Sequence, residues 1–247
     1  MTALTPAAAA EWLKLRSIRS TWWFAGGALL TMLLVAVMEA EDTAGFLRRQ
    51  GQPVEPVSSV LAAVEWVQLI FGAFGMLAVT GEYATRSIVV TLACTPSRTR
   101  LLLAKTAVVG AATLAAGGLI AALGVASSAP LLRKYWEFDL GQVTGRILAI
   151  AAYMALIAVL ALGLGTLIRR SAGTLTVLFA LLYVLPTGLQ GFASSLNAEF
   201  LNTVADFTPG PAGERFMAGD MAFGLVLIAW AVAAVVTGAW VMRGRDA

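Results

Sequence analysis

The residues that could carry chemistry are few, because most of this chain is apolar. Of the 247 residues, 59% are hydrophobic and only 13% are charged, whereas a soluble globular domain carries about 25% charged residues. The chain has no histidine and one cysteine, Cys94, which excludes histidine-ligated metal sites, Ser-His and Cys-His catalysis, and an internal disulfide. It also lacks the G-x-x-x-x-G-K-[ST] loop that cradles ATP phosphates. We therefore expect neither an enzyme nor a cofactor or metal site within this chain.

Glu65 and Gln68 are polar residues inside a predicted membrane span, and both are candidates for a transport path. A charge at the bilayer centre costs about 2.5–3.5 kcal/mol on insertion scales, and less near an interface. Glu65 is the only acid well inside a predicted span. The sequence leaves two interpretations open: Glu65 faces a watery vestibule and contacts substrate or an external gate, or it pairs with Arg48, Arg49 or a loop amide.

A second polar group lies in the fifth predicted span. Thr176, Tyr183, Thr187 and Gln190 follow one another at spacings of seven, four and three residues, which places them within about 60° of each other on an ideal helix. They are candidates for the lining of a path at a dimer interface, although such groups also join helices at about 0.6 kcal/mol per hydrogen bond. The face is neutral and partly aromatic, which favours amphipathic or hydrophobic cargo. Pro186 should bend or break this helix toward its outer end.

Six apolar runs position these residues. About 20 apolar residues cross the roughly 30 Å of a bilayer core, and the runs have about that length. We expect an all-α membrane protein with six transmembrane helices in a single transmembrane domain, residues 1–247. The third run contains the small-residue stripe Gly110, Gly117 and Gly124, which predicts close packing against another span. The predicted spans lie near 22–38, 57–79, 106–128, 147–168, 172–192 and 221–242.

The distribution of basic residues predicts the orientation. The N-terminus, the 80–105 loop, the 169–171 loop and the C-terminus hold eleven Lys and Arg residues, and the other three loops hold six. By the positive-inside rule both termini are cytoplasmic. Residues 1–20 mix Trp and Leu with Lys and Arg, which favours an interfacial helix over an ordinary juxtamembrane anchor. No basic run or stacking array indicates a nucleic-acid partner.

The outer loops differ in character. Residues 39–56 read as a short external connection. Residues 193–220 are too apolar for a solvated loop, so we expect a re-entrant or cap segment of short helices there. Phe192, Phe200 and Phe207 would form an apolar plug as the outer gate, and the turn at Pro209-Gly210-Pro211 would end the segment.

The 80–100 segment is polar at its start, then apolar, and is stopped by Thr95-Pro96-Ser97, which is typical of a short surface helix offered to a partner. Two runs in and near it carry a family resemblance. Gly81-Glu82-Tyr83-x-Thr85-x-x-Ile88, followed by Thr91-Leu92-Ala93-x-Thr95-Pro96-Ser97-Arg98, resembles the signature loop of ABC transporter permeases of the second exporter type (ABC-2 type). The run Glu11-Trp12-x-Lys14-Leu15-Arg16 resembles the opening of the same family.

This resemblance implies a permease without its own ATPase. In that family the loop is a cytoplasmic coupling helix that docks on a separate soluble ABC ATPase subunit, which binds ATP and Mg. The family usually has glycine where this chain has Arg86, so Arg86 either adds an ion pair with the ATPase or marks a divergent partner. The residues expected to couple are Glu82, Tyr83, Thr85, Arg86, Ile88 and Leu92.

The expected assembly is two permease chains, as a homodimer, with two ATPase copies in a bacterial cytoplasmic membrane. Six spans are few for a pathway of drug or lipid size, so two chains placed face to face are the economical solution. The expected function is ATP-driven export of a drug, antibiotic, lipid or peptide. The alternative is a standalone membrane channel or assembly factor without an ATPase partner.

Overall fold

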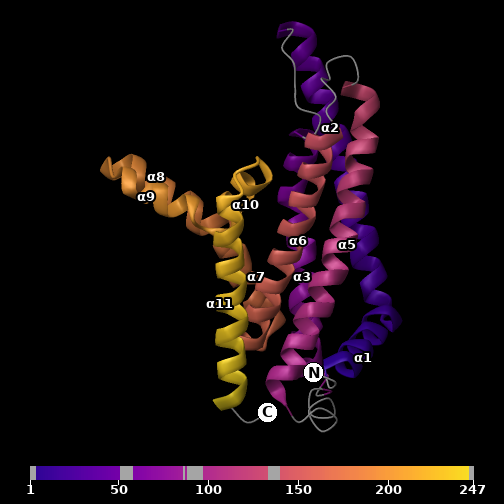
Figure 1. Cartoon of the computed structure of the whole chain (residues 1–247). Coiled ribbons are helices and arrows are strands. Elements are labelled where there is room, and N and C mark those ends of the chain that lie inside the picture. Colours follow the sequence, from indigo (N-terminus) through magenta and orange to yellow (C-terminus); the bar gives the residue numbers. More distant parts are fainter. Residues whose placement is uncertain (1–3, 51–57, 86, 88–96, 133–139, 245–247) are drawn as a thin grey trace.

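Helices make up every regular element in the part of the chain that the structure describes, as the apolar runs predict (Figure 1). This structure is a computed structural model. It describes residues 4–50, 58–85, 87, 97–132 and 140–244, without the side chains of 4, 5, 47–50 and 243. The elements are α1 (Leu4–Ser17), α2 (Arg19–Gln50), α3 (Ser58–Ala84), α5 (Arg98–Leu132), α6 (Leu140–Ile168), α7 (Ser171–Phe179), the π-helical η2 (Ala180–Val184), α8 (Leu185–Leu196), α9 (Glu199–Asp206), α10 (Pro209–Met217) and α11 (Ala222–Gly244).

Six of the described helical stretches are long and apolar enough to cross a membrane, which confirms the predicted all-α, multi-pass fold. Both ends of the chain lie at the same end of the bundle (Figure 1). We call this end the inner end and the opposite one the outer end; that the inner end is cytoplasmic stays a prediction. The six stretches are Arg19–Phe46, Ser58–Ala84, Arg98–Leu132, Leu140–Ile168, Ser171–Leu196 and Ala222–Met242.

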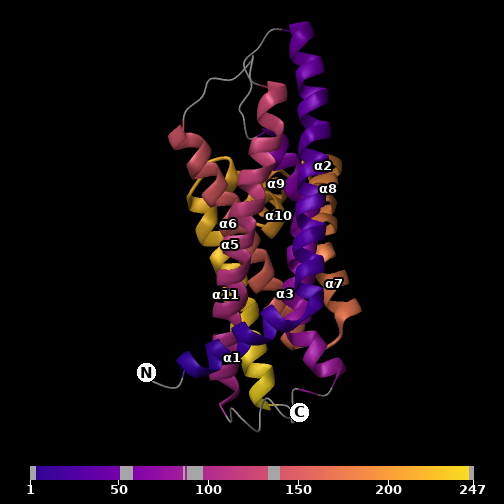
Figure 2. The ribbon, with the colours of Figure 1, turned by 90° about the vertical axis from the view of Figure 1, so that its right-hand side faces the viewer.

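The first long helix corrects the prediction of a loop at 39–56. Helix α2 continues to Gln50 and reaches beyond its neighbours at the outer end (Figure 2). Its 32 residues correspond to roughly 48 Å of helix, well beyond the 17-residue span expected at 22–38. Residues 39–50 contain no proline and are rich in Ala, Glu and Arg, which are good helix formers. The polarity of residues 39–50 suggested a loop, but their high helix propensity extends α2 to Gln50.

Helix α6 is the centre of the bundle and packs against α3, α5 and α11. Small residues allow these helices to approach closely. A Cβ placed on Gly75 of α3 would lie 2.1 Å from the carbonyl oxygen of Ala158 on α6. The predicted stripe on the third span is confirmed as a packing surface: Gly117 meets Met154 of α6, whereas Gly124 meets Met32 of α2. The bundle thus depends on backbone contact along α6.

We predict that Gly75→Ala loosens the contact between α3 and α6. The new methyl group would meet the backbone of Ala158 on α6, which cannot move aside as a flexible side chain can. We therefore expect the free energy of unfolding to fall by about 1–3 kcal/mol, the usual cost of overpacking. The measurement is thermal or denaturant unfolding in a fixed detergent. Gly27→Ala on α2 is the matched control, because no described atom lies within 4 Å of a Cβ at that position. Equal stability of the two variants would contradict this account of the packing.

The fifth span is bent where proline predicts. Helix α7 passes into the π-helical η2, and α8 then turns away from the bundle with Pro186 in its first turn (Figure 1). Proline has no N–H to donate to the carbonyl four residues earlier, that of Leu182. Gly210 of α10 lies so close to this carbonyl that a Cβ there would sit 2.5 Å from the oxygen. Helix α10 therefore packs against the fifth span at the point where that span is broken.

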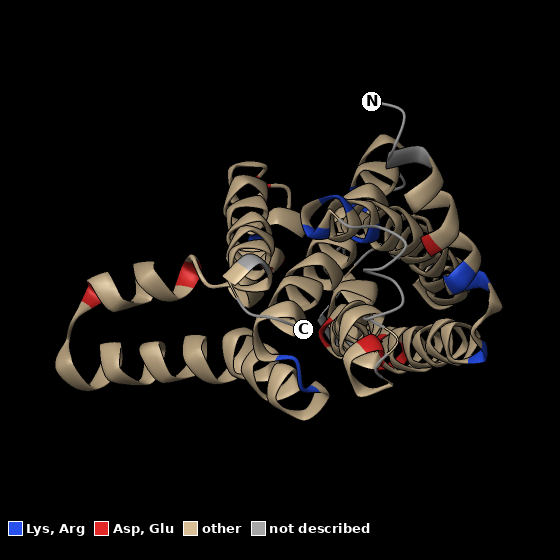
Figure 3. Ribbon diagram, turned by 90° about the horizontal axis from the view of Figure 1, so that it is seen from below, with Lys and Arg blue, Asp and Glu red and all other residues tan. Residues whose placement is uncertain are grey.

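The region 193–220 contains short helices, as expected, whereas its re-entrant or cap role stays a prediction. Helices α8 and α9 run side by side as a hairpin that projects away from the bundle (Figure 3). Asn197 adopts a left-handed conformation (φ 50°) at the end of α8 and allows the chain to reverse there. The Pro209-Gly210-Pro211 run does not end this segment as a turn. It begins α10 instead, because proline is favoured in the first turn of a helix.

Candidate functional site

Four charged side chains meet at the inner end, and we call them the inner charge cluster: Glu11, Lys14, Glu82 and Lys105. The Nζ of Lys105 donates to Glu11 Oε2 at 2.5 Å and to Glu82 Oε1 at 2.8 Å. Lys14 also pairs with Glu82 Oε1. Lys105, Glu82 and Glu11 are only 3%, 4% and 6% exposed. The two acids and two bases balance in charge, which is the condition for burying them.

The inner charge cluster joins three helices around one segment. Glu11 and Lys14 come from α1, Glu82 from the last turn of α3, and Lys105 from the second turn of α5. Helix α3 ends at Ala84 and α5 begins at Arg98. The cluster therefore holds both ends of the predicted coupling segment. Sequence reasoning missed this contact, although the two runs that carry the family resemblance contain three of its residues, Glu11, Lys14 and Glu82.

The expected coupling residues differ in their surroundings: some contact their own chain, one is exposed, and the rest are not described by the structure. Glu82 is engaged with cations of its own chain instead of facing outward. The Tyr83 ring lies under the Arg169 guanidinium, 5.1 Å from the ring centroid. Thr85 is exposed, and its hydroxyl donates to the carbonyl of Gly81. Arg86, Ile88 and Leu92 lie outside the described residues, so their docking role stays a prediction.

We predict that Lys105→Met breaks the inner charge cluster. Two buried carboxylates would lose their shared cation, and breaking a buried pair from one side costs about 3–5 kcal/mol. The measurement is the free energy of unfolding in detergent. Arg16→Met is the control, because Arg16 is an exposed base on the same α1. The double variant Lys105→Met with Glu82→Gln should lose less than the sum of the single changes. Additive losses would show that the two side chains are not coupled.

A second group of polar side chains lies in the outer half of the bundle. Gln68 of α3 is buried, and its amide nitrogen donates to the Tyr183 hydroxyl at 2.8 Å and to the Glu65 carbonyl at 3.1 Å. The hydroxyl of Tyr153 on α6 donates to the amide oxygen of Gln68, and the Tyr183 hydroxyl donates to the Glu65 carbonyl. This network joins α3, α6 and η2 and fixes the Gln68 side chain. The structure thus brings Gln68 and Tyr183 together, from two different candidate groups.

The four polar residues of the fifth span do not share one face. Tyr183 points toward α3, whereas Thr176, Thr187 and Gln190 are exposed. The spacing argument assumed a continuous α-helix, but η2 lies between Thr176 and Thr187. A π-helical turn holds an extra residue and rotates everything that follows it. The predicted single polar face is therefore wrong, and this is the physical reason.

An outer pocket of about 310 Å³ opens between α3, α6 and α10. Glu65, Gln68 and Glu214 are its polar lining residues together with Tyr153. Glu65 is exposed to this space, and in the described part of the chain no basic side chain forms an ion pair with its carboxylate or with that of Glu214. The expected alternative, pairing with Arg48 or Arg49, falls on side chains outside the described set. The vestibule interpretation of Glu65 agrees with this geometry, and sequence reasoning missed Glu214.

The carboxyl of Glu214 titrates in an unfavourable environment. Partial burial raises its pKa above the usual value, and the nearby Glu65 carboxylate raises it further. A raised pKa in the folded state means that the stabilising contribution is complete below the usual pKa and is lost as pH rises through the raised value. Above the raised pKa the ionised form of Glu214 is therefore less favourable for the fold than the neutral form.

We predict that Glu214→Gln raises the unfolding temperature at pH 7 and that this gain shrinks toward zero as the buffer is acidified. Thermal unfolding of both proteins across a pH series in one detergent measures it. Glu199→Gln serves as the matched control, since Glu199 is an exposed acid on α9 outside the pocket. A gain that is constant with pH would reject electrostatic repulsion as its cause.

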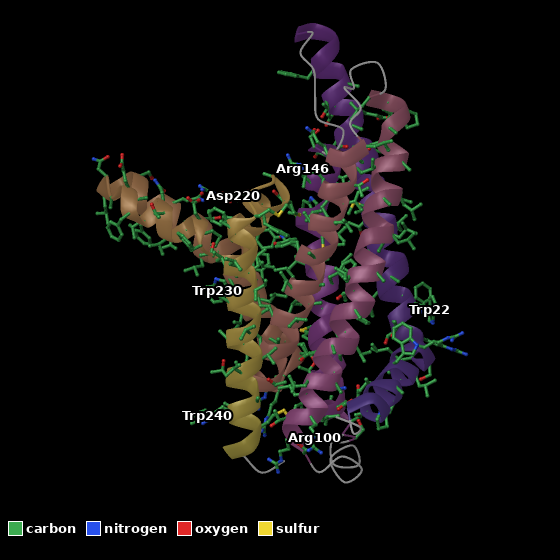
Figure 4. All side chains as sticks on the ribbon, viewed as in Figure 1. Trp22, Arg100, Arg146, Asp220, Trp230 and Trp240 are labelled. Carbon is green, nitrogen blue, oxygen red and sulfur yellow. The ribbon has the colours of Figure 1, made fainter. Side chains whose placement is uncertain are left out.

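The three candidate gate phenylalanines lie on or beside the α8–α9 hairpin. Phe192, Phe200 and Phe207 are 65%, 67% and 50% exposed, so they do not form a plug within this chain. Phe207 stacks near Phe223 of α11, with ring centroids 5.7 Å apart, and its carbonyl accepts a hydrogen bond from Trp230. The aromatic rings of the hairpin hang mainly from its side facing the inner end (Figure 4). The hairpin is thus amphipathic, and its closing role stays a prediction.

No protein-family model and no curated protein sequence matches this chain.

Proposed function

We propose that this protein is the membrane-spanning subunit of an ATP-driven exporter, a permease of the ABC-2 type that works with a separate ATPase. The observation that carries the proposal is the inner charge cluster, which anchors α1, α3 and α5 around the segment between Ala84 and Arg98. A segment that receives force from a partner must be fixed at both of its ends. Here both ends are fixed by the same buried ions.

Further contacts spread this anchoring to other helices at the inner end. Arg98, the first residue of α5, donates to the carbonyl of Met242 near the end of α11. Arg169, in the tight turn between α6 and α7, stacks over Tyr83 of α3. Movement of the 85–97 segment would therefore act on α3, α5, α11 and the α6–α7 turn together. This arrangement supports a coupling role for the segment.

The exposed surface of the fifth span supports the second part of the proposal, a homodimer. Thr176, Thr187 and Gln190 are exposed on Ser171–Leu196, one helical stretch of membrane-spanning length. Polar side chains are rare at lipid-facing positions because transfer into hydrocarbon is unfavourable. A second copy of the permease would cover them and enclose a path for amphipathic or hydrophobic cargo. In this proposal two ATPase copies complete the exporter and bind ATP and Mg.

The first test is assembly. We predict that the protein, purified in mild detergent with its membrane-associated partners, forms a complex of two permease and two ATPase chains. Native mass spectrometry measures this stoichiometry directly. Vanadate-sensitive ATP hydrolysis by the same sample would identify the partner as an ABC ATPase. A functional permease that stays without any ATPase would favour the alternative, a standalone channel or assembly factor.

The second test is coupling. We predict that Arg86→Glu leaves the protein in the membrane but separates ATP hydrolysis from transport, because a reversed charge in the docking segment opposes contact with the ATPase. Transport and hydrolysis are measured together in proteoliposomes. Arg16→Glu makes the same charge reversal on α1, at an exposed position of the same inner end. Unchanged coupling in Arg86→Glu, or equal loss in both variants, would count against the assigned segment.

A further inference from the structure

The outer pocket holds two acids: Glu65, which belongs to the expected transport path, and Glu214, which that path did not include. Its volume of about 310 Å³ reaches the lower end of the range for small-molecule sites, about 300–1,000 Å³. The pocket lies between three elements, with Glu65 contributed by α3, Tyr153 by α6 and Glu214 by α10. It is a hollow with charge on two sides, so it can discriminate between ligands by charge as well as by shape.

The basic residues near the pocket are engaged elsewhere. Arg146 of α6 donates to the carbonyl of Met217 and lines a neighbouring pocket with Gln142. Arg215 pairs with Asp206 at 2.5 Å and lies over the Phe223 ring. Neither is paired with Glu65 or Glu214 in the described part of the chain. The acids of the pocket therefore keep their charge available for a ligand.

The rest of the pocket suits the apolar part of a ligand. Leu61, Val64 and Met217 form an apolar wall. The Tyr153 side chain is only 1% exposed and its ring packs against Gly213 of α10, so it belongs to the supporting structure of the pocket. Gln68 contributes little free hydrogen-bonding capacity, because its amide already binds Tyr153 and Tyr183. The network thus holds α3 and α6 in place, and the ligand contacts would come from the two carboxylates and the apolar side chains.

We propose that the outer pocket binds the positively charged head of an amphipathic molecule, such as a quaternary ammonium or protonated amine, with Glu65 and Glu214 as the anionic contacts. This inference rests on the proposed export function and narrows its cargo to amphipathic cations. Carboxylates supply the opposite charge that a cationic head needs when it leaves water, and the apolar wall covers its alkyl part. A bound cation would also remove the repulsion between Glu65 and Glu214, so binding should stabilise the folded protein.

The test uses the purified full-length permease in lipid nanodiscs, without ATPase, and tritiated benzyltrimethylammonium as the probe. We expect saturable binding and a rise in unfolding temperature on adding the probe. The double variant Glu65→Gln with Glu214→Gln should weaken binding by about tenfold or more, a loss of about 1.4 kcal/mol or more. Each single variant should bind the probe with an affinity between those of the unmodified protein and the double variant. The single variants also test the proposal if the double variant does not fold.

Two controls make the result specific. Glu199→Gln, an exposed acid outside the pocket, should bind the probe as the unmodified protein does. Neopentylbenzene, the neutral isostere with carbon in place of nitrogen, should not compete. Absence of saturable binding, equal binding by the Gln variants, or equal competition by the neutral isostere would overturn the proposal. Native mass spectrometry of the ATPase complex is independent of these results, so a failed cation site is distinguishable from a failed export function.

Discussion

The contact of Lys105 with two carboxylates is the interaction on which the inner end of this protein depends. An ammonium group buried to this degree is unfavourable unless anions surround it. Lys105 meets that condition only because α1 supplies Glu11 and α3 supplies Glu82. The pairing therefore fixes how α1 lies across the base of the bundle, and it fixes the distance between the end of α3 and the start of α5. A single buried charge thus determines the position of three helices.

The rest of the bundle is organised by a different constraint, close backbone contact along α6 from Ala151 to Gly165. Small residues bring α3, α5 and α11 against this central helix, and α10 closes over it because Gly213 leaves room for the Tyr153 ring. The polar network of Gln68 is formed inside this packed region. Two different forces therefore act in the bundle: neutralised charge joins α1, α3 and α5 at the inner end, and van der Waals contact with a few hydrogen bonds joins the long helices along α6.

The sequence predicted the elements better than their contacts. The length of the apolar runs was enough to predict the six long helices, and Pro186 was enough to predict the bend in the fifth. The end of α2 was missed because polar residues at 39–50 suggested a loop although their helix propensity is high. The common face of Thr176 and Tyr183 was wrong because a π-helical turn changes the register locally. Pairings such as Glu11 with Lys105 are separated by 94 positions, and periodicity within one helix carries no information about them.

The same separation has a consequence for biosynthesis. Glu11 and Lys14 leave the ribosome first, and Lys105 follows 94 residues after Glu11. At about 5–20 residues per second this interval lasts roughly 5–20 s. During it α1 has no protein partner for its acid, so lipid headgroups and water must solvate this helix. Docking of α1 onto α5 therefore comes after the third long helix has been translated, so α1 precedes α3 and α5 in the chain but reaches its place only after both have been made.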